Sequence, residues 1–550
     1  MVKDILEAEL LGALEALSLP ISNIHLEHPD DPALGDYATN SALLYGKENA
    51  QDPMGIAEKI RAALLARKVP FISKIEVAKP GFVNIFLSRD FLTDNTKRIL
   101  SEKENYGKNT LLSGKKVIVE YTDPNPFKEF HIGHLMSNAI GESLSRIFEF
   151  SAALVKRANY QGDVGLHIAK ALWGIERGEI HPGKAYAIGN KAYEEDAKAK
   201  EAIILLNRKI YERSDASVTA LYDRGRKESL QEFEKIYKRL GTTFDFYFFE
   251  SEAGPFGKKV VDDALPKGIF QKSDGAIVFP GEKYGLHTRV FITKENLPTY
   301  EAKELGLAKI KFEKYPYESS IVITGNEVKE YFMVIMKAME LVFPDLAKKT
   351  RHISHGMVRL PSGKMSSRTG EVIAADTLLS EVKNSLTKKV GAIEEKLLDQ
   401  IAVGAVKYSM LKQAIGKDVI FDFEKSISLT GDSGPYLQYT HARSRSVLEK
   451  GRSEGIKAHI EKASETTKEI ERILYQFPEV VERALEEYAP HYIANYLHTL
   501  ASLFNTFYND TKIVQKDDPE SPYKLAVTEA VATVLGRGLH LLGIAAPERM

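Results

Sequence analysis

Two histidines three residues apart, His131 and His134, lie in the stretch PNPFKEFHIGHLMSNAIGES with Gly133 between them. The stretch follows a strand-like segment, KKVIVEYT, and opens an apolar pattern of helical period. Three uses fit these residue types: two ligands of a metal, a cradle for phosphate, or two surface histidines without a role. Metal binding is disfavoured, because a site needs at least one more ligand and the nearby Glu129 and Glu142 have no ligand spacing. Backbone N–H groups at a helix N-terminus attract anionic oxygen and imidazoles donate hydrogen bonds to it, so the pattern favours phosphate binding.

A second basic segment, GKMSSRTG, occupies residues 363–370. Lys364 and Arg368 flank Ser366 and Ser367 between two glycines, an arrangement suited to the negative charge that builds on a leaving pyrophosphate. Each motif by itself is also typical of an ordinary loop. A histidine pair at a strand–loop–helix junction, followed far downstream by such a basic loop, indicates one nucleotide-binding site formed from distant parts of the chain.

The elements that must position these motifs divide the chain into three predicted domains. Residues 1–110 combine helical patterns with two alternating strand patterns and predict an α+β domain. Residues 111–385 alternate strands and helices, with strands predicted at AALVKRANY, GAIVFP, TRVFIT and SSIVITG, which favours an α/β fold with a parallel sheet. Long charged helices near 175–245 predict an insertion into that sheet. Residues 386–550 are almost wholly of helical period and predict a helical bundle.

Composition narrows the class of protein. The 550 residues exceed the size of one hydrophobic core, and 43% hydrophobic with 27% charged residues is typical of a soluble globular protein. There is no cysteine, which excludes disulfides and thiolate metal sites and fits a reducing cytoplasm. The acidic, amphipathic start MVKDILEAELLGALEAL is not a signal peptide, and no run reaches the roughly 18 apolar residues of a membrane span, so no membrane partner is expected. With a net charge of −1, any nucleic-acid contact must come from local basic patches.

The histidine pair and the downstream basic loop together resemble the signature of class I aminoacyl-tRNA synthetases, which implies a nucleotide-binding, doubly wound parallel sheet of Rossmann type. Longer stretches are similar to the arginyl-tRNA synthetase family: VEYTDPNPFKEFHIGHLMSN, NYQGDVGLHIAK, LPTYEAKELGLA, GPYLQYTHARSR and the final LHLLGIAAPERM. HPDDPALGDYATNSALL and KPGFVNIFL resemble that family's amino-terminal tRNA-binding domain. The resemblance covers nearly the full chain and implies a ligase that uses ATP to join L-arginine to the 3′ end of tRNA(Arg), releasing AMP and pyrophosphate.

The resemblance also implies an arginine site. A guanidinium is planar and permanently charged, so a selective pocket needs positioned carboxylates and an aromatic or hydroxyl wall. The residues implied for arginine binding are Glu120, Asn125, Tyr300, Glu304, Asp163 and His167. Glu304 stands where the family usually has aspartate, and Val328 and Tyr331 stand where it commonly shows glutamine and histidine. Because Val328 cannot form a hydrogen bond, a contact to the substrate amino group must come from water or from another residue.

The resemblance further implies sites for ATP and for RNA. The catalytic candidates are His131, His134, Lys364 and Arg368, and the ATP-binding candidates are Lys128, His131, Gly133, His134, Lys364, Met365, Ser366 and Ser367, with Mg²⁺ bound to the substrate and no metal held by the protein. The tRNA-binding candidates are Phe82, Asn84 and Phe86 near the amino terminus, and Tyr436, Gln438, Arg443, Arg445, Phe504, Tyr508, Arg537 and Met550 in the bundle. Aromatic and basic side chains can stack on or pair with unpaired bases, although helix cores and solvated faces use the same residue types. The family is usually monomeric, so a cytoplasmic monomer is expected.

Two other functions stay open at this point. One is an RNA-binding protein that has kept the fold and lost catalysis, against which the intact His131, His134 and Lys364 argue. The other is a different nucleotidyltransferase that uses the same histidine motif on a small molecule. Such an enzyme would not need a helical carboxyl-terminal domain.

Overall fold

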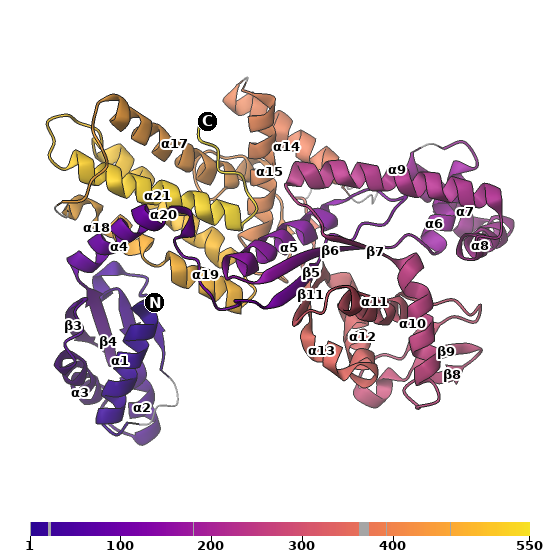
Figure 1. Ribbon diagram of the computed structural model, residues 1–550, viewed down its shortest axis with the longest axis horizontal. Helices are drawn as coiled ribbons and strands as arrows, with labels where there is room; N and C mark the ends of the chain where they lie inside the picture. The colour runs from indigo at the N-terminus through magenta and orange to yellow at the C-terminus, as the bar shows by residue number, and fades with distance from the viewer. Residues whose placement is uncertain (1, 20–23, 180, 362–372, 392, 462–463) are drawn as a thin grey trace.

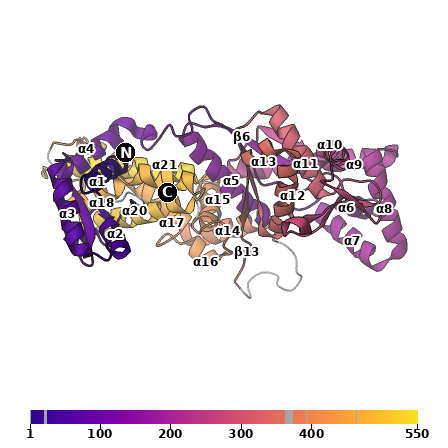
Figure 2. The ribbon, with the colours of Figure 1, turned by 90° about the horizontal axis from the view of Figure 1, so that it is seen from below.

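The structure is a computed structural model that describes residues 2–550 except 20–23, 180, 362–372, 392 and 462–463. The molecule is elongated, with a small α+β region and a helical bundle at one end and a large α/β region at the other (Figures 1 and 2). Over the described part of the chain, no helix combines the length and the apolar character that a membrane span requires.

The amino-terminal region is built on a four-stranded antiparallel sheet with the order β1-β2-β4-β3. Its elements are α1 (Val2–Ala16), β1 (Leu26–Glu27), η1 (Pro32–Leu34), β2 (Tyr37–Thr39), α2 (Ser41–Asn49), α3 (Pro53–Ala66), β3 (Ile72–Ala78) and β4 (Phe82–Leu87). β3 and β4 form a hairpin around Pro80 and Gly81, as their alternating patterns predict. The apolar face of this sheet buries Ile75, Val83 and Ile85 against the helices.

The central region is built on a five-stranded sheet with the order β12-β11-β5-β6-β7, in which every neighbouring pair is parallel. The strands are β5 (Lys116–Glu120), β6 (Leu154–Gln161), β7 (Phe246–Phe249), β11 (Ser319–Gly325) and β12 (Thr350–His355). The apolar run of β5 is buried throughout, because helices cover both faces of a parallel sheet. The direction of strand addition reverses between β5 and β11, and ligands of such sheets bind outside the carboxyl ends of the strands at this point.

Helices connect and extend the parallel sheet. α5 (Ile132–Phe150) crosses from β5 to β6 and is buried over most of its length. The insertion between β6 and β7 contains α6 (Leu166–Ile175), α7 (Pro182–Glu195), α8 (Ala197–Glu212) and α9 (Ala216–Leu240). Between β7 and β11 lie α10 (Glu250–Ala264), β8 (Gln271–Ser273), β9 (Ala276–Phe279), η3 (Gly281–Tyr284), β10 (Arg289–Ile292) and α11 (Tyr300–Lys314), and between β11 and β12 lie η4 (Asn326–Val328), α12 (Lys329–Val342) and α13 (Pro344–Lys349).

The remaining elements are mostly helices that pack beside α5. They are β13 (Val358–Arg359), α14 (Ala375–Val390), α15 (Glu395–Leu411), β14 (Val419–Ile420), α16 (Phe423–Ser426), α17 (Gly434–Ser453), η5 (Glu465–Thr467), α18 (Lys468–Leu474), α19 (Phe477–Glu486), α20 (His491–Asp510) and α21 (Ser521–Leu541). α4 (Arg89–Glu102) and η2 (Lys103–Asn105) lead from the amino-terminal sheet to β5. α4 packs on the bundle, where Arg89 donates a hydrogen bond to the buried Glu471 at 2.5 Å.

The predicted fold class is confirmed: an α/β region with a parallel sheet stands between an α+β region and a helical bundle. Two of the predicted parallel strands are wrong. GAIVFP and TRVFIT form β9 and β10, which pair antiparallel in a separate three-stranded sheet with β8. The loop between them is too short for the crossover of a dozen or more residues that a parallel pair needs. β7 and β12 complete the parallel sheet instead, and the domain boundaries at 110 and 385 stay predictions.

Candidate active site

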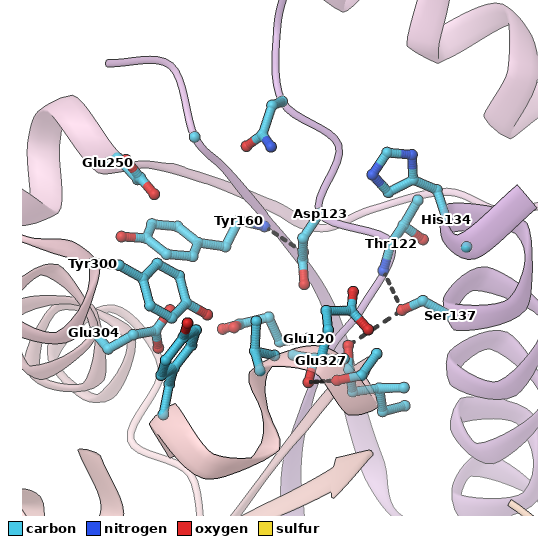
Figure 3. Close-up of a pocket in the computed structure, with 18 of the residues that line it drawn as sticks. Glu120, Thr122, Asp123, His134, Ser137, Tyr160, Glu250, Tyr300, Glu304 and Glu327 are labelled. Atoms are coloured by element: carbon cyan, nitrogen blue, oxygen red, sulfur yellow. Dashed lines mark hydrogen bonds between the residues drawn. The ribbon is translucent and has the colours of Figure 1, made fainter. Parts of the chain in front are cut away.

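A cavity of about 520 Å³ opens where β5, β6 and β11 end, beside the first turn of α5 (Figure 3). Histidines of α5 line one side, and carboxylates from β5, α10 and α11 line the other. The residues predicted from sequence that line it are Glu120, Asn125, His131, Gly133, His134, Tyr300 and Glu304. The fold therefore gathers candidates that lie far apart along the chain into one cavity.

The two histidines cap the helix that they begin. His131 is the N-cap residue of α5, and its Nδ1 accepts a hydrogen bond from the backbone N–H of Gly133 at 3.1 Å. Nδ1 of His134 accepts from the backbone N–H of His131 at 3.1 Å, and the two rings stack with centroids 3.7 Å apart. Because each Nδ1 acts as an acceptor, the proton of each neutral imidazole is on Nε2.

Both imidazoles are held in the neutral form. Burial lowers the pKa of His131 to about 4, with Glu327 opposing the shift and Lys128 adding to it. Burial also lowers the pKa of His134 well below its ordinary value, and the charges of His131 and Lys128 add to that shift. At neutral pH the helix start thus presents two Nε2–H donors without net charge. It can bind phosphate oxygens by hydrogen bonds, and the positive charge that a triphosphate needs must come from other groups.

The turn after β5 has an unusual backbone conformation. Thr122 and Asp123 have φ angles of 82° and 45°, a region that β-branched residues rarely adopt. The N–H of Thr122 donates to Oγ of Ser137 on α5 at 2.9 Å, and the N–H of Tyr160 on β6 donates to the Asp123 carboxylate at 2.7 Å. These bonds tie the turn to its two neighbours, and both of its side chains line the cavity. Such conformations concentrate at functional sites, where the surroundings hold them.

Three carboxylates, Glu120, Asp123 and Glu304, form the acidic side of the cavity (Figure 3). Glu120 is 1% exposed and accepts a hydrogen bond at 2.7 Å from Nζ of Lys311, which is also buried. Glu304 is 4% exposed, and its Oε1 has no hydrogen-bond partner. Burial raises the pKa of Glu304 to about 8, and burial also raises the pKa of Asp123 well above its usual range, with the charge of Glu120 adding to each shift. The buried carboxylate of Glu304 and the half-buried one of Asp123, beside the paired Glu120, create a strong preference for a cationic ligand.

A second buried ion pair completes the acidic wall. Nζ of Lys303 on α11 donates to Glu250 at the start of α10 at 2.5 Å, and both side chains are buried. The hydroxyl of Tyr160 is buried on the same wall and has no hydrogen-bond partner. Unsatisfied buried polar atoms are costly unless a ligand or water pairs with them, so this wall is built to receive a polar group.

Two predicted arginine ligands, Asp163 and His167, do not line the cavity. Asp163 is fully buried and accepts hydrogen bonds from the N–H and hydroxyl of Ser251 at 2.8 Å each and from Nε of Arg226 at 2.9 Å. Nε2 of His167 lies 2.9 Å from the backbone oxygen of Gly162, to which it donates. Asp163 thus holds the loop after β6 to α9 and α10, while His167, at the start of α6, bonds back to that loop. Their polar atoms are satisfied within the fold, and their assignment to arginine binding stays a prediction.

The structure shows the positions of only some of the predicted ATP-binding residues. Lys128 does not line the cavity, and its Nζ lies 4.8 Å from the ring centroid of Tyr186 on α7. Lys364, Met365, Ser366, Ser367 and Arg368 lie outside the described residues. Ile373 follows that segment, and its backbone oxygen accepts a hydrogen bond at 3.0 Å from the N–H of Ile132. The chain at Ile373, where the described residues resume, therefore lies against the first turn of α5.

Several lining residues were not singled out from the sequence, among them Asp123, Glu250, Arg289 and His355. Asp123 stands two residues before Asn125 in the quoted stretch, where Asp-Pro also reads as ordinary turn chemistry. Arg289 stacks its guanidinium 3.8 Å from the ring centroid of Tyr331, a contact between β10 and α12 that no local pattern reveals.

Part of the predicted RNA surface forms a second cavity, of about 670 Å³, between α17, α20 and the carboxyl terminus. It brings together Arg443, Tyr508 and Met550. The Arg443 guanidinium lies 4.7 Å from the ring centroid of Tyr508 and 4.8 Å from that of Tyr439. A cationic plane between aromatic rings at an open cavity is suited to an unpaired base.

Other RNA candidates are placed where RNA cannot reach them. Phe504 is fully buried in the bundle core, and Gln438 is fully buried with its amide donating to Ala545 at 2.9 Å. Asn84 is 4% exposed within β4. Stacking or pairing with a base needs an accessible side chain, which these three residues do not offer in this structure, and their assignments stay predictions. Phe82, Phe86, Tyr436, Arg445 and Arg537 stay predictions; Arg445 pairs with Glu548 and Arg537 with Glu104.

The parallel sheet, the histidine-capped helix at its switch point and the helical carboxyl-terminal region together define a class I aminoacyl-tRNA synthetase. Residues 95–423 match the family profile described as tRNA synthetases class I (R), catalytic domain. Residues 2–87 match the arginyl tRNA synthetase N terminal domain, and residues 437–550 match the DALR anticodon binding domain. The chain belongs to the arginyl-tRNA synthetase family.

Individual relatives agree along the whole chain. The arginine–tRNA ligase of Treponema denticola is 31% identical, over 94% of this chain and 93% of that one. Among solved structures, the arginyl-tRNA synthetase of Thermus thermophilus has a TM-score of 0.74 at 24% identity, covering 100% of both chains. The Plasmodium falciparum enzyme has a TM-score of 0.80 at 19% identity, covering 100% of this chain and 99% of that one. The two solved structures support the fold alone, because their sequence identity to this chain is low. The family assignment rests on the sequence matches.

Proposed function

We propose that this chain activates L-arginine with ATP and transfers it to the 3′ end of tRNA(Arg) in protein synthesis. The proposal rests on one cavity whose two sides differ in chemistry, one being acidic and the other donating hydrogen bonds. At one side Glu304 offers a buried carboxylate oxygen without a partner, beside Glu120. At the other side the start of α5 offers the Nε2–H donors of His131 and His134, whose Nδ1 atoms are occupied as helix caps. A substrate with a cationic end and an activated phosphate end fits both.

Selection for arginine rests on the acidic side of the cavity. Glu304 accepts the guanidinium with its free oxygen, Glu120 adds a second carboxylate that Lys311 holds in place, and Tyr300 forms the wall beside Glu304 (Figure 3). A guanidinium offers paired donors in one plane, whereas the ammonium of lysine is a point charge on a different stem. Lysine would leave a buried carboxylate imperfectly paired, a loss that gives strong discrimination without a separate editing step.

The nucleotide binds at the other end. His131 and His134 donate Nε2–H bonds to phosphate oxygens, and Gly133 keeps the helix start open to the nucleotide. Mg²⁺ arrives with ATP as a substrate ion and neutralises part of the triphosphate charge. We assign Lys364 and Arg368 to the leaving pyrophosphate on the resemblance of their motif, and Ile373, five residues after Arg368, accepts a hydrogen bond from Ile132 at the start of α5.

The reaction proceeds in two displacements. A carboxylate oxygen of arginine attacks the α-phosphorus of ATP, the new P–O bond forms, and the bond to the bridging oxygen breaks so that pyrophosphate leaves with the electron pair. A ribose hydroxyl of the terminal adenosine then attacks the carbonyl carbon of arginyl-adenylate and loses its proton, and AMP leaves. Neither step needs a protein nucleophile, so positioning and charge stabilisation supply the acceleration.

The affinity for arginine is expected to rise with pH between pH 6 and pH 8. The pKa of Glu304 is raised to about 8, so below that pH the free enzyme holds a proton that the guanidinium must displace. The apparent dissociation constant should fall by up to about tenfold per pH unit and level off above the pKa. Calorimetric titrations in buffers of different ionisation enthalpy should show proton release on binding. Affinity that is constant from pH 6 to pH 8 would contradict this assignment of charge.

Replacing Arg443 by alanine is expected to raise the KM for tRNA(Arg) by about tenfold, because the substitution removes a cation and a stacking plane from the cavity of α17 and α20. The KM for arginine should stay unchanged, since that cavity is separate from the one at β5. Steady-state aminoacylation with varied tRNA measures the effect. An equal rise in both KM values would indicate a general loss of structure and not an RNA contact.

The function itself is tested by ATP–pyrophosphate exchange with each of the twenty amino acids, with and without tRNA(Arg). Arginine alone should support exchange. Binding of tRNA without any exchange would favour an RNA-binding protein that has lost catalysis, and exchange driven by a substrate other than an amino acid would favour a different nucleotidyltransferase. We further propose that the chain acts as a cytoplasmic monomer, as the resemblance implies.

A further inference from the structure

The stretch HPDDPALGDYATN leads into β2 of the amino-terminal region and contacts the bundle at α18 (Figures 1 and 2). Nε of Arg472 on α18 donates to the carboxylate of Asp36 at 2.8 Å. Nη2 of Arg472 donates to the backbone oxygens of Pro32 and Gly35 at 3.0 and 2.9 Å. The side chains of Arg472 and Asp36 are only 12% and 5% exposed. One guanidinium from the bundle thus bonds three groups of a single loop, away from water.

Glu479 at the start of α19 makes a second contact with the same stretch. One of its carboxylate oxygens accepts a hydrogen bond from the hydroxyl of Tyr37 at 2.5 Å, and the other lies 3.0 Å from Nε2 of His28. The ring of Tyr475 is buried between these contacts, with its centroid 6.1 Å from that of Tyr37. Two charged side chains of the bundle therefore grip both ends of the loop that precedes β2.

These contacts fix an orientation that the chain itself leaves free. Residues 1–87 have one covalent connection to the rest of the protein, at Ser88 between β4 and α4. Beyond Ser88, the buried core of the amino-terminal region includes only Leu92 and Tyr475 among the described residues. So small an apolar contact permits rotation, whereas a guanidinium with several fixed acceptors has one geometry. The loop contacts are therefore the main determinant of how the amino-terminal region is oriented on the bundle.

Both regions present side chains that suit RNA. Phe86 on β4 is half-buried, and Nζ of Lys74 on β3 lies 5.1 Å from its ring centroid. In the bundle, Arg443 and Tyr508 lie together at the cavity of α17 and α20. An RNA that touches both regions binds more tightly when their separation is fixed, because the second contact then forms within one complex and needs no further ordering of the protein.

We propose that Arg472 and Glu479 are positioning residues for tRNA: they orient the amino-terminal region so that it and the cavity of α17 and α20 bind one tRNA molecule at the same time. The inference rests on the proposed function and deepens it, because it concerns bundle residues that lie outside both cavities. It also gives the stretch HPDDPALGDYATN a docking role in place of a direct contact with RNA.

The test compares two RNAs on the full chain. Fluorescence anisotropy at one fixed salt concentration measures the Kd of tRNA(Arg) and of a hairpin with only its anticodon stem and loop. Arg472→Met should raise the Kd of the whole tRNA on the order of tenfold, since simultaneous binding is lost, and that of the hairpin by less than about twofold. Arg472→Lys keeps the charge but not the planar fork, so it should give an intermediate Kd for the tRNA.

A matched control lies one helix further on. Arg483 on α19 is exposed and pairs with Glu487 at 2.9 Å within its own helix. Arg483→Met removes the same type of side chain without touching the amino-terminal region, so it should leave the Kd of both RNAs within about twofold. Calorimetric titration with arginine should give the same Kd for every variant, because the active-site cavity is separate from α18 and α19.

Four results would overturn the proposal. An unchanged Kd of the whole tRNA in Arg472→Met would show that docking does not affect RNA binding, and an equal rise for both RNAs would show a general effect on the bundle. A hairpin that fails to bind the unmodified protein would remove the bundle cavity as an independent RNA site. If the unmodified protein binds neither RNA, the proposed function fails as well, before any substitution.

Thermal unfolding monitors the fold of each variant. Arg472→Met leaves the buried carboxylate of Asp36 without its cationic partner. If that variant does not fold, the double variant Asp36→Asn with Arg472→Met replaces it, because it removes both charges of the pair. The same separation between the two RNAs is expected of the double variant.

Discussion

Replacing Glu304 by glutamine is expected to raise the KM for arginine on the order of a hundredfold at pH 8, equivalent to about 3 kcal/mol, with a smaller change in kcat. Oε1 of Glu304 is an unsatisfied buried acceptor, to which we assign the guanidinium, and glutamine keeps the size of the side chain while removing the charge. The contact is remote from the reacting phosphorus, so its loss weakens binding of the ground state and the transition state alike. Pyrophosphate exchange with varied arginine measures both constants.

The same chemical change elsewhere on α11 provides the control. Glu313 is exposed and lies 3.8 Å from Lys309 on the solvent side of that helix. Glu313→Gln should leave the KM for arginine within about twofold, because exposed ion pairs contribute little. If Glu304→Gln behaves like Glu313→Gln, the acidic side of the cavity does not bind the guanidinium, and the orientation of the substrate must be reversed.

Replacing His134 by alanine is expected to lower kcat on the order of a hundredfold with little change in the KM for arginine. We assign the Nε2–H of His134 to a phosphate oxygen whose charge increases in the transition state, and a fixed donor of this kind contributes mainly to the chemical step. Its Nδ1 also caps the N–H of His131, so alanine loosens the first turn of α5. In His134→Gln, the side-chain oxygen of the glutamine can accept the same hydrogen bond from the N–H of His131. This variant should therefore recover the thermal stability that alanine loses but only part of kcat.

A second histidine with a similar environment serves as the control for His134. Burial lowers the pKa of His540 on α21 to about 4, and its side chain contacts Arg146 outside the active-site cavity. His540→Ala should leave kcat within about twofold. A kcat unchanged by His134→Ala would remove phosphate binding as the role of the histidine pair.

The fold was predictable in outline because its signals are local. The apolar strand before Glu120 and the helical period after His134 define a strand–loop–helix unit, and the long apolar stripes beyond residue 386 define helices. β9 and β10 were assigned to the wrong sheet, because a short apolar strand has the same appearance in a parallel and an antiparallel sheet. The short segment between the two strands indicates an antiparallel pair, because a parallel pair needs a longer crossover.

Residues of the site were predictable from the sequence only where the residue type by itself indicates the role of the side chain. Glu120, Tyr300 and Glu304 were predicted and line the cavity. The lysines that neutralise the acidic wall were not predicted, since Lys303 and Lys311 look like ordinary solvent-facing residues of a charged helix. Their burial depends on the sheet against which α11 packs. The environment of Asp163 was also hidden from the sequence: it has the residue type of a ligand, but its carboxylate accepts hydrogen bonds from α9 and α10.

The central claim is that one cavity holds the guanidinium of arginine at its acidic side and the nucleotide at the start of α5. A crystal structure of the full chain with arginyl-sulfamoyl-adenosine, a stable analogue of arginyl-adenylate, tests it most directly. The account predicts the guanidinium within hydrogen-bond distance of Glu304 and the sulfamoyl group facing the imidazoles of His131 and His134. A guanidinium directed to solvent, or an adenosine seated among the carboxylates of Glu120 and Glu304, would contradict it.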